Sequence, residues 1–89
     1  MQSSFVQFNT QIWKEGNMYV AYIPQLRLSS CGYTIEEADK NIREVIEIFF
    51  EETDRKGTTK EVLEEAGFLF DNGWRAPEIL KLERISLAI

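Results

Sequence analysis

The stretch that decides the fold is TIEEADKNIREVIEIFFEETDRKG, residues 34–57. Apolar residues recur within it at spacings of three and four, which is the pattern of a helix with one buried face. Thr34 and Glu37 have the spacing of a reciprocal capping box, and Lys56-Gly57 is typical of a helix end. The sequence therefore predicts a long amphipathic helix with a buried face formed by Ile35, Ala38, Ile42, Val45, Ile46, Phe49 and Phe50.

The residues before this helix alternate in character instead of recurring at helical spacing. Apolar and polar side chains alternate from Phe5 to Trp13, which predicts a half-buried strand. Turn chemistry over residues 14–17 then separates it from a second run, Met18 to Ile23, so the two runs predict a hairpin. Pro24 cannot donate to a β-ladder and ends the second strand, after which Leu26 to Cys31 predicts a short third strand.

The residues after the long helix predict a second helix and a final strand. Thr58 and Glu61 repeat the capping-box spacing, and Gly67 ends this shorter helix. A turn is predicted over residues 71–73. From Glu83 to Ile89 apolar and polar residues alternate again, which predicts a last strand that joins the sheet.

These elements predict an α+β protein with the order β-β-β-α-α-β, in one domain over residues 1–89. The long helix would cover one face of an antiparallel sheet. The first two strands, however, carry apolar or aromatic residues on both faces, Trp13 among them. We therefore expect a homo-dimer or tetramer, in which a second copy or another protein covers the remaining face.

The composition argues against an enzyme. The chain contains no histidine, the usual titrating group near neutral pH. Cys31, the single cysteine, is expected to be a buried structural residue. The glutamate pairs at 36–37, 51–52 and 64–65 are typical of solvated helix faces. No phosphate-binding glycine motif occurs, and no carboxylate lies on the first strand. The sequence predicts no catalytic residue, metal site or cofactor.

The formal net charge of −5 disfavours direct nucleic-acid binding and favours a basic protein partner. With one cysteine no internal disulfide can form, so a reducing compartment is expected. No stretch approaches the about 20 apolar residues of a membrane span, and the start, MQSSFVQFNTQ, lacks the order of a signal peptide. A cytoplasmic protein without membrane contact is expected.

Several short motifs are spaced as in one known family. A hairpin, a strand ended by proline, the pattern S-x-G-x-T and the pattern E-A-x-x-N-I follow one another over roughly the first fifty-five residues. In this order they resemble the HicB-like antitoxins, in the short form that has no C-terminal DNA-binding module. The residues that carry the resemblance are Glu15-Gly16, Tyr19-Val20-Ala21, Ile23-Pro24, Ser30, Gly32, Thr34, Glu37-Ala38, Asn41-Ile42 and Glu44.

The resemblance implies a partial ribonuclease-H-like fold and a binding role against a small basic HicA-like toxin that cleaves mRNA. Two features depart from the family pattern. Arg27-Leu28-Ser29 stands where a proline-glycine turn is common, and residues 1–89 include no helix-turn-helix or ribbon-helix-helix module. Alternatives are an orphan homo-oligomeric member without a toxin, and a degenerate nuclease that still binds nucleic acid.

Two regions are predicted to bind the partner. The polar face of the long helix carries carboxylates around one apolar residue, and a tryptophan lies in an aromatic cluster, Phe68, Phe70 and Trp74, beside the turn at residues 71–73. A basic toxin surface would complement the first region. The predicted contact residues are Glu37, Glu44, Ile48, Glu51, Glu52 and Trp74.

Overall fold

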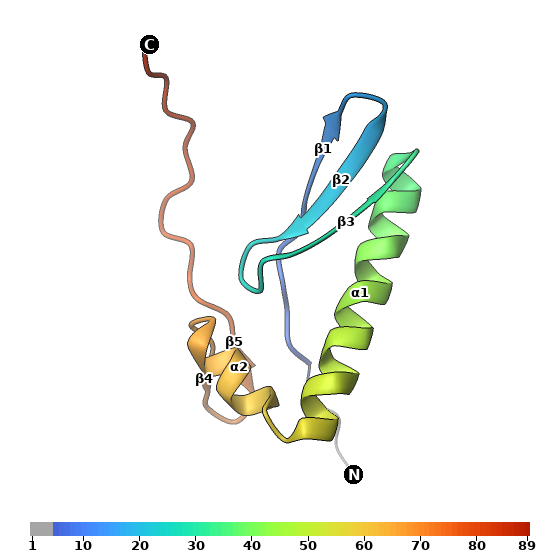
Figure 1. The fold of residues 1–89 in the computed structure, drawn as a ribbon. Helices are drawn as coiled ribbons and strands as arrows, with labels where there is room; N and C mark the ends of the chain where they lie inside the picture. Colours follow the sequence, from blue (N-terminus) through green and yellow to red (C-terminus); the bar gives the residue numbers. More distant parts are fainter. Residues whose placement is uncertain (1–4) are drawn as a thin grey trace.

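The computed structural model describes residues 5–89, and residues 1–4 of the predicted domain lie outside the described residues. A three-stranded antiparallel sheet comes first, followed by a long helix, a short helix and a two-stranded hairpin (Figure 1). The α+β class is therefore confirmed. The elements are β1 (Gln11–Glu15), β2 (Met18–Ile23), β3 (Leu28–Gly32), α1 (Ile35–Lys56), α2 (Thr59–Glu65), β4 (Leu69–Phe70) and β5 (Trp74–Arg75).

The predicted first hairpin is present, but its first strand is displaced toward the turn. β1 begins at Gln11, which pairs with Tyr22, and ends at Glu15, which pairs with Met18. The prediction of a strand from Phe5 was wrong, because a longer ladder would bring residues before Gln11 opposite Pro24, which has no N–H to donate. The loop is only Gly16 and Asn17; Gly16 has a φ of 60°, which glycine adopts readily.

The third strand begins two residues later than predicted. Residues 24–27 form a turn in which the Leu26 amide donates to the Ile23 carbonyl at 3.3 Å and the Arg27 amide to the Pro24 carbonyl at 3.4 Å. Arg27 has a φ of 56°, so an extended strand cannot run through it. β3 then pairs antiparallel with β2, from Leu28 opposite Ile23 to Gly32 opposite Tyr19.

The long helix starts and ends where the sequence predicts. Thr34 Oγ1 accepts from the Glu37 amide at 3.0 Å, and Gly57 closes the helix with a φ of 72°. The reciprocal half of the capping box differs from the expectation. The Glu37 carboxylate accepts from the amide of Tyr33 at 3.5 Å, one residue before the one predicted.

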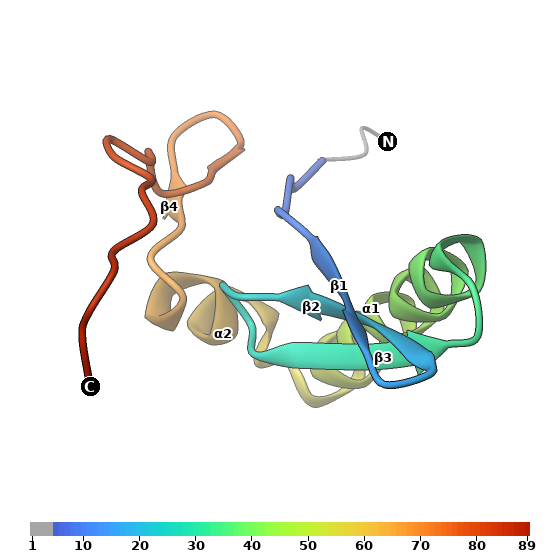
Figure 2. The same ribbon diagram turned by 90° about the horizontal axis from the view of Figure 1, so that it is seen from above.

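The main core lies between α1 and one face of the sheet (Figure 2). Its fully buried members come from the central strand and the helix, and Phe8, Ile12 and Val45 are among the side chains packed around them. Among the seven residues of the predicted helix stripe, only Ile35 is mostly exposed, at 52%. The buried members are Ala21, Ile23, Ala38 and Ile42.

The end of β3 lies in close contact with the first turns of α1. A Cβ atom on Gly32 would be 2.6 Å from the Cβ of Glu37 and 2.7 Å from the backbone nitrogen of Ala38. The backbone of the helix cannot yield as a flexible side chain could. Gly32 therefore sets the distance between strand and helix.

Replacing Gly32 by alanine is expected to lower the free energy of unfolding by about 1–3 kcal/mol, because the added methyl group overpacks a buried contact. Urea denaturation followed by circular dichroism measures the change. Ser29→Ala, at an exposed position of the same strand, is the control and should change the free energy by less than about 0.5 kcal/mol. Equal stability of the two variants would contradict this interpretation of the contact.

The C-terminal third departs most from the prediction. The Thr58 hydroxyl donates to the Thr53 carbonyl at 3.5 Å instead of capping α2. The turn at residues 71–73 is confirmed, but it joins β4 and β5 in a small hairpin of its own. The strand predicted over residues 83–89 is absent. Residues 76–89 form an exposed extended segment that leaves the body of the protein beside α2 (Figure 1).

Candidate functional site

One exposed face of α1, adjoining the face that packs on the sheet, carries four of the six predicted contact residues; the first of them, Glu37, lies next to Gly32 at the end of β3. Glu37, Glu44, Ile48 and Glu51 are exposed and follow one another at spacings of seven, four and three, so they share one face of the helix. Ile48 is 65% exposed, although it is a large apolar side chain. This helix face therefore places carboxylates around one accessible hydrophobic residue.

Glu52, a fifth predicted contact residue, is occupied by neighbours on its own helix. Its carboxylate accepts from Arg55, and the Lys56 ammonium lies 3.4 Å away. The hydrogen bond from Arg55, the larger cause, and the charge of Lys56 lower the pKa of Glu52 below its usual value. With two cations beside it, Glu52 contributes less negative charge to the helix face than Glu44 or Glu51.

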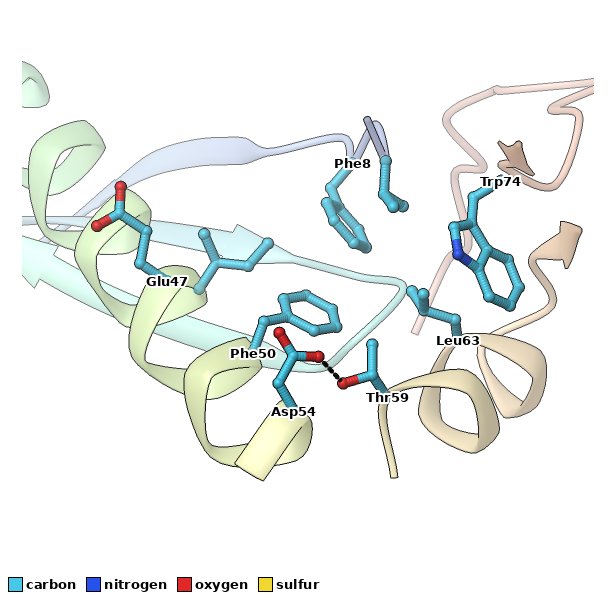
Figure 3. Close-up of a pocket in the computed structure, with 9 residues that line it drawn as sticks. Phe8, Glu47, Phe50, Asp54, Thr59, Leu63 and Trp74 are labelled. Carbon is cyan, nitrogen blue, oxygen red and sulfur yellow. Dashed lines mark hydrogen bonds between the residues drawn. The ribbon is translucent and has the colours of Figure 1, made fainter. Parts of the chain in front are cut away.

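Trp74, the sixth predicted contact residue, lies apart from this helix face. Its half-buried indole lines a groove of about 550 Å³ between the N-terminal segment, the end of α1 and α2 (Figure 3). Phe70 packs edge-on against it with ring centroids 5.2 Å apart. The lining is mostly apolar, with polar groups at residues 47, 54 and 59, and includes Val6, Phe8, Ile46, Phe50, Leu63 and Trp74.

The sequence did not predict this groove. Phe8 was assigned to a strand and Phe50 to the main core, whereas their rings lie 5.6 Å apart and Phe8 also packs against Phe68 at 5.2 Å. One signal in the sequence could have indicated an apolar groove, namely the number of aromatic residues in the segments flanking the sheet. Whether these aromatic side chains meet depends on the direction in which the chain leaves α1, and no local sequence pattern specifies that direction.

The face of the sheet that points away from α1 is also apolar. The register places Trp13, Val20 and Cys31 side by side across the three strands. Trp13 is 39% exposed, and its ring packs edge-on against Tyr22 with centroids 6.1 Å apart. The prediction that the sheet carries apolar residues on both faces is confirmed. Cys31 lies on this open face and is exposed, so the prediction that it is buried was wrong.

No group of three or more Cys, Asp or Glu side chains within residues 5–89 is arranged to hold a metal ion. None of the helices in the described part of the chain is long and apolar enough to cross a membrane. Comparison with protein-family models, curated proteins and solved structures gave no match. The surfaces described above and the sequence resemblance are thus the basis for a functional proposal.

Proposed function

We propose that this chain is an antitoxin-type binding protein of the HicB-like kind, with a partial ribonuclease-H-like fold and no catalytic activity of its own. Its partner is a small basic HicA-like toxin that cleaves mRNA, and binding in the cytoplasm covers the toxin's active face. The three antiparallel strands followed by a long helix suit this family. The net charge of −5 favours a basic partner.

The observation that carries this proposal is the outward face of α1. Glu44 and Glu51 flank Ile48, which keeps 65% of its surface exposed. The two charged residues nearest to Ile48 on this face are thus acidic, and an apolar residue with a charged rim is typical of a protein interface. A surface that binds RNA is basic, so these carboxylates would both attract the toxin and occupy the place of the phosphates.

An alternative function is that of an orphan member that assembles only with itself. The apolar outer face of the sheet, with Trp13, Val20 and Tyr22, supports it, because such a face is a common interface between identical subunits. The two functions use different surfaces. They can therefore be separated by changing one surface at a time.

The decisive experiment measures association of the purified chain with a small basic protein that co-purifies with it from the native cell. In the variant Glu44→Lys/Glu51→Lys, association is expected to slow by about tenfold at low salt, because steering charges act mainly on the on-rate. Its dependence on ionic strength should also flatten. Stopped-flow or surface-plasmon measurements at two salt concentrations give both quantities.

The matched control is Glu64→Lys/Glu65→Lys, which makes the same change in formal charge at exposed positions on α2. It should retain most of the association rate. If both double variants slow association equally, only the net charge matters and the helix face is not the binding site. If no basic protein co-purifies and the chain still forms oligomers, the orphan function is favoured.

A further inference from the structure

The segment from residue 78 to residue 89, here called the arm, ends in a strand-like sequence but has no strand partner within residues 5–89. Ile85, Leu87 and Ile89 alternate with Arg84, Ser86 and Ala88, which is the period-two pattern of a β-strand with one apolar face. Every residue of the arm is exposed, and Ile85 and Leu87 are 80% and 81% exposed. Apolar side chains at such regular spacing are rarely left in water.

The arm stands away from the rest of the protein. It does not join the three-stranded sheet, and both ribbon views show a gap between the two (Figures 1 and 2). The radius of gyration is 15.3 Å, whereas a compact domain of this length has about 12 Å. A Cβ atom on Gly67 would lie 3.0 Å from the Pro77 ring, so the base of the arm packs beside α2. Residues 76–89 contain no glycine, asparagine or aspartate that would favour a turn back toward the sheet.

The three-stranded sheet has two outer edges, and they differ in their capacity to accept another strand. At the β3 edge, the Asn41 side chain donates to the Cys31 carbonyl at 2.8 Å, and Gly32 is closed in by the first turns of α1. At the other edge, β1 pairs only with β2 within residues 5–89. A free edge of this kind presents unpaired backbone groups and is a template for strand addition.

We propose that the arm of one chain adds as a strand to the free edge of β1 in a second copy, and that the second copy returns its own arm in the same way. Residues 83–89 would span about 23 Å as a strand, enough to cover the about 17 Å of the five-residue β1. The exchange is reciprocal, so it closes as a symmetric dimer.

The side chains of the arm match that position. With Ile85, Leu87 and Ile89 turned toward the α1 side, they would extend the core beyond Ile12 and Ile46, which are only partly buried in the single chain. Arg84 and Ser86 would then face solvent. The arm carries two acidic and two basic residues, so its docking on an acidic protein adds no net repulsion. Arm exchange uses neither Glu44 nor Glu51 and does not depend on a toxin partner.

The test compares two variants of the full chain by sedimentation equilibrium. The wild type is expected to have twice the 10.4 kDa mass of the single chain at micromolar concentration. Ile85→Asn/Leu87→Asn should be monomeric, since it removes the apolar face of the added strand. Arg84→Asn/Ser86→Asn carries the same introduced residues on the other face and should remain dimeric. The substitutions lie in an exposed segment, so the fold of each chain should be unchanged by circular dichroism.

Hydrogen exchange followed by mass spectrometry then locates the contact. In the wild-type dimer, amides of residues 84–88 and the outward amides of β1 should be protected, and this protection should disappear in Ile85→Asn/Leu87→Asn. A wild-type monomer would overturn the proposal, whether its arm is protected or not. A dimer that survives in Ile85→Asn/Leu87→Asn, or one whose arm or β1 edge exchanges freely, would overturn it as well and would favour the outer sheet face as the interface.

Discussion

Replacing Ile42 by alanine is expected to lower the free energy of unfolding by about 2–5 kcal/mol, the range for deleting a fully buried aliphatic side chain. Ile42 has no exposed surface and lies between α1 and the sheet, in the same cluster as Ala21 and Ile23. Those neighbours belong to the central strand, which has little freedom to move into the space left behind. The cavity term should therefore be large.

A loss of this size is serious for a small domain. At about 0.05–0.15 kcal/mol per residue, the whole chain of 89 residues would have a stability of about 4–13 kcal/mol. Urea denaturation at a fixed protein concentration measures the change, and the concentration must be constant because dimerisation adds to apparent stability. A lower urea concentration at the midpoint, with an unchanged slope of free energy against urea concentration, would identify a loss of stability and not a change in the compactness of the folded state.

The control for Ile42 is Ile48→Ala, the same substitution six residues further along the same helix. Ile48 is 65% exposed, so its truncation removes little buried surface and should change the free energy by less than about 0.5 kcal/mol. The pair separates burial from helix propensity. Both variants replace isoleucine by alanine within the same helix, so the gain in helix propensity is the same in each and only the loss of buried surface differs. Similar losses in the two variants would contradict the assignment of the buried face of α1.

Much of this fold could be predicted because its signals are local. The start of α1 depends on Thr34 and the amide three residues later, and its end depends on a glycine with positive φ. The hairpin of β1 and β2 follows from alternation and a glycine-asparagine turn. Where only neighbouring residues decide a structure, their identity is sufficient information.

The errors arose where a segment needs a distant partner. Phe8 has the alternation of a strand residue, yet it packs on Phe50 and Phe68, because β2 ends at Ile23 and the chain opposite Phe8 has already turned away at Pro24. The pattern of residues 83–89 identifies a strand but cannot say which sheet receives it. The structure leaves that segment outside its own sheet. Alternation thus indicates a preference for a sheet, and the partner is decided by tertiary or quaternary contacts.

Among the candidate binding residues, too, the positions that depend on local spacing were predicted and those that depend on distant contacts were not. Helical spacing alone placed Glu44, Ile48 and Glu51 on one face of α1, and the structure has them there. The ion pairs along the helix were not predicted. Glu52 is one helical turn from Arg55 and Lys56, whose positive charges offset its negative charge. Trp74 contributes to the apolar groove and not to the helix face, because the hairpin that carries it packs beside α2.

Replacing Phe68 by alanine is expected to lower the free energy of unfolding by about 3–5 kcal/mol, the largest single loss in the C-terminal third. Phe68 is 1% exposed, although it lies just after α2 in a short connection. Its ring packs against Phe8, whose ring packs in turn against Phe50 at the end of α1. These three packed rings therefore connect the N-terminal segment, the long helix and the region that carries the arm, and Phe68 is the member from that last region.

Phe70→Ala is the matched control, because Phe70 is 59% exposed and its main partner is Trp74 at 5.2 Å. Loss of that aromatic pair should cost no more than about 1.5 kcal/mol. Trp74 lines the groove beside these rings, so in a Trp13→Phe background, where Trp74 is the single tryptophan, fluorescence should shift to longer wavelength in Phe68→Ala before the main transition. Such an early shift would show that α2 and the hairpin separate from the sheet and α1. If Phe68→Ala were as stable as Phe70→Ala, the aromatic contacts would not be what fixes the C-terminal third, and α2 would be held by its other contacts, such as the buried Leu63 and the Thr53–Thr59 hydrogen bond.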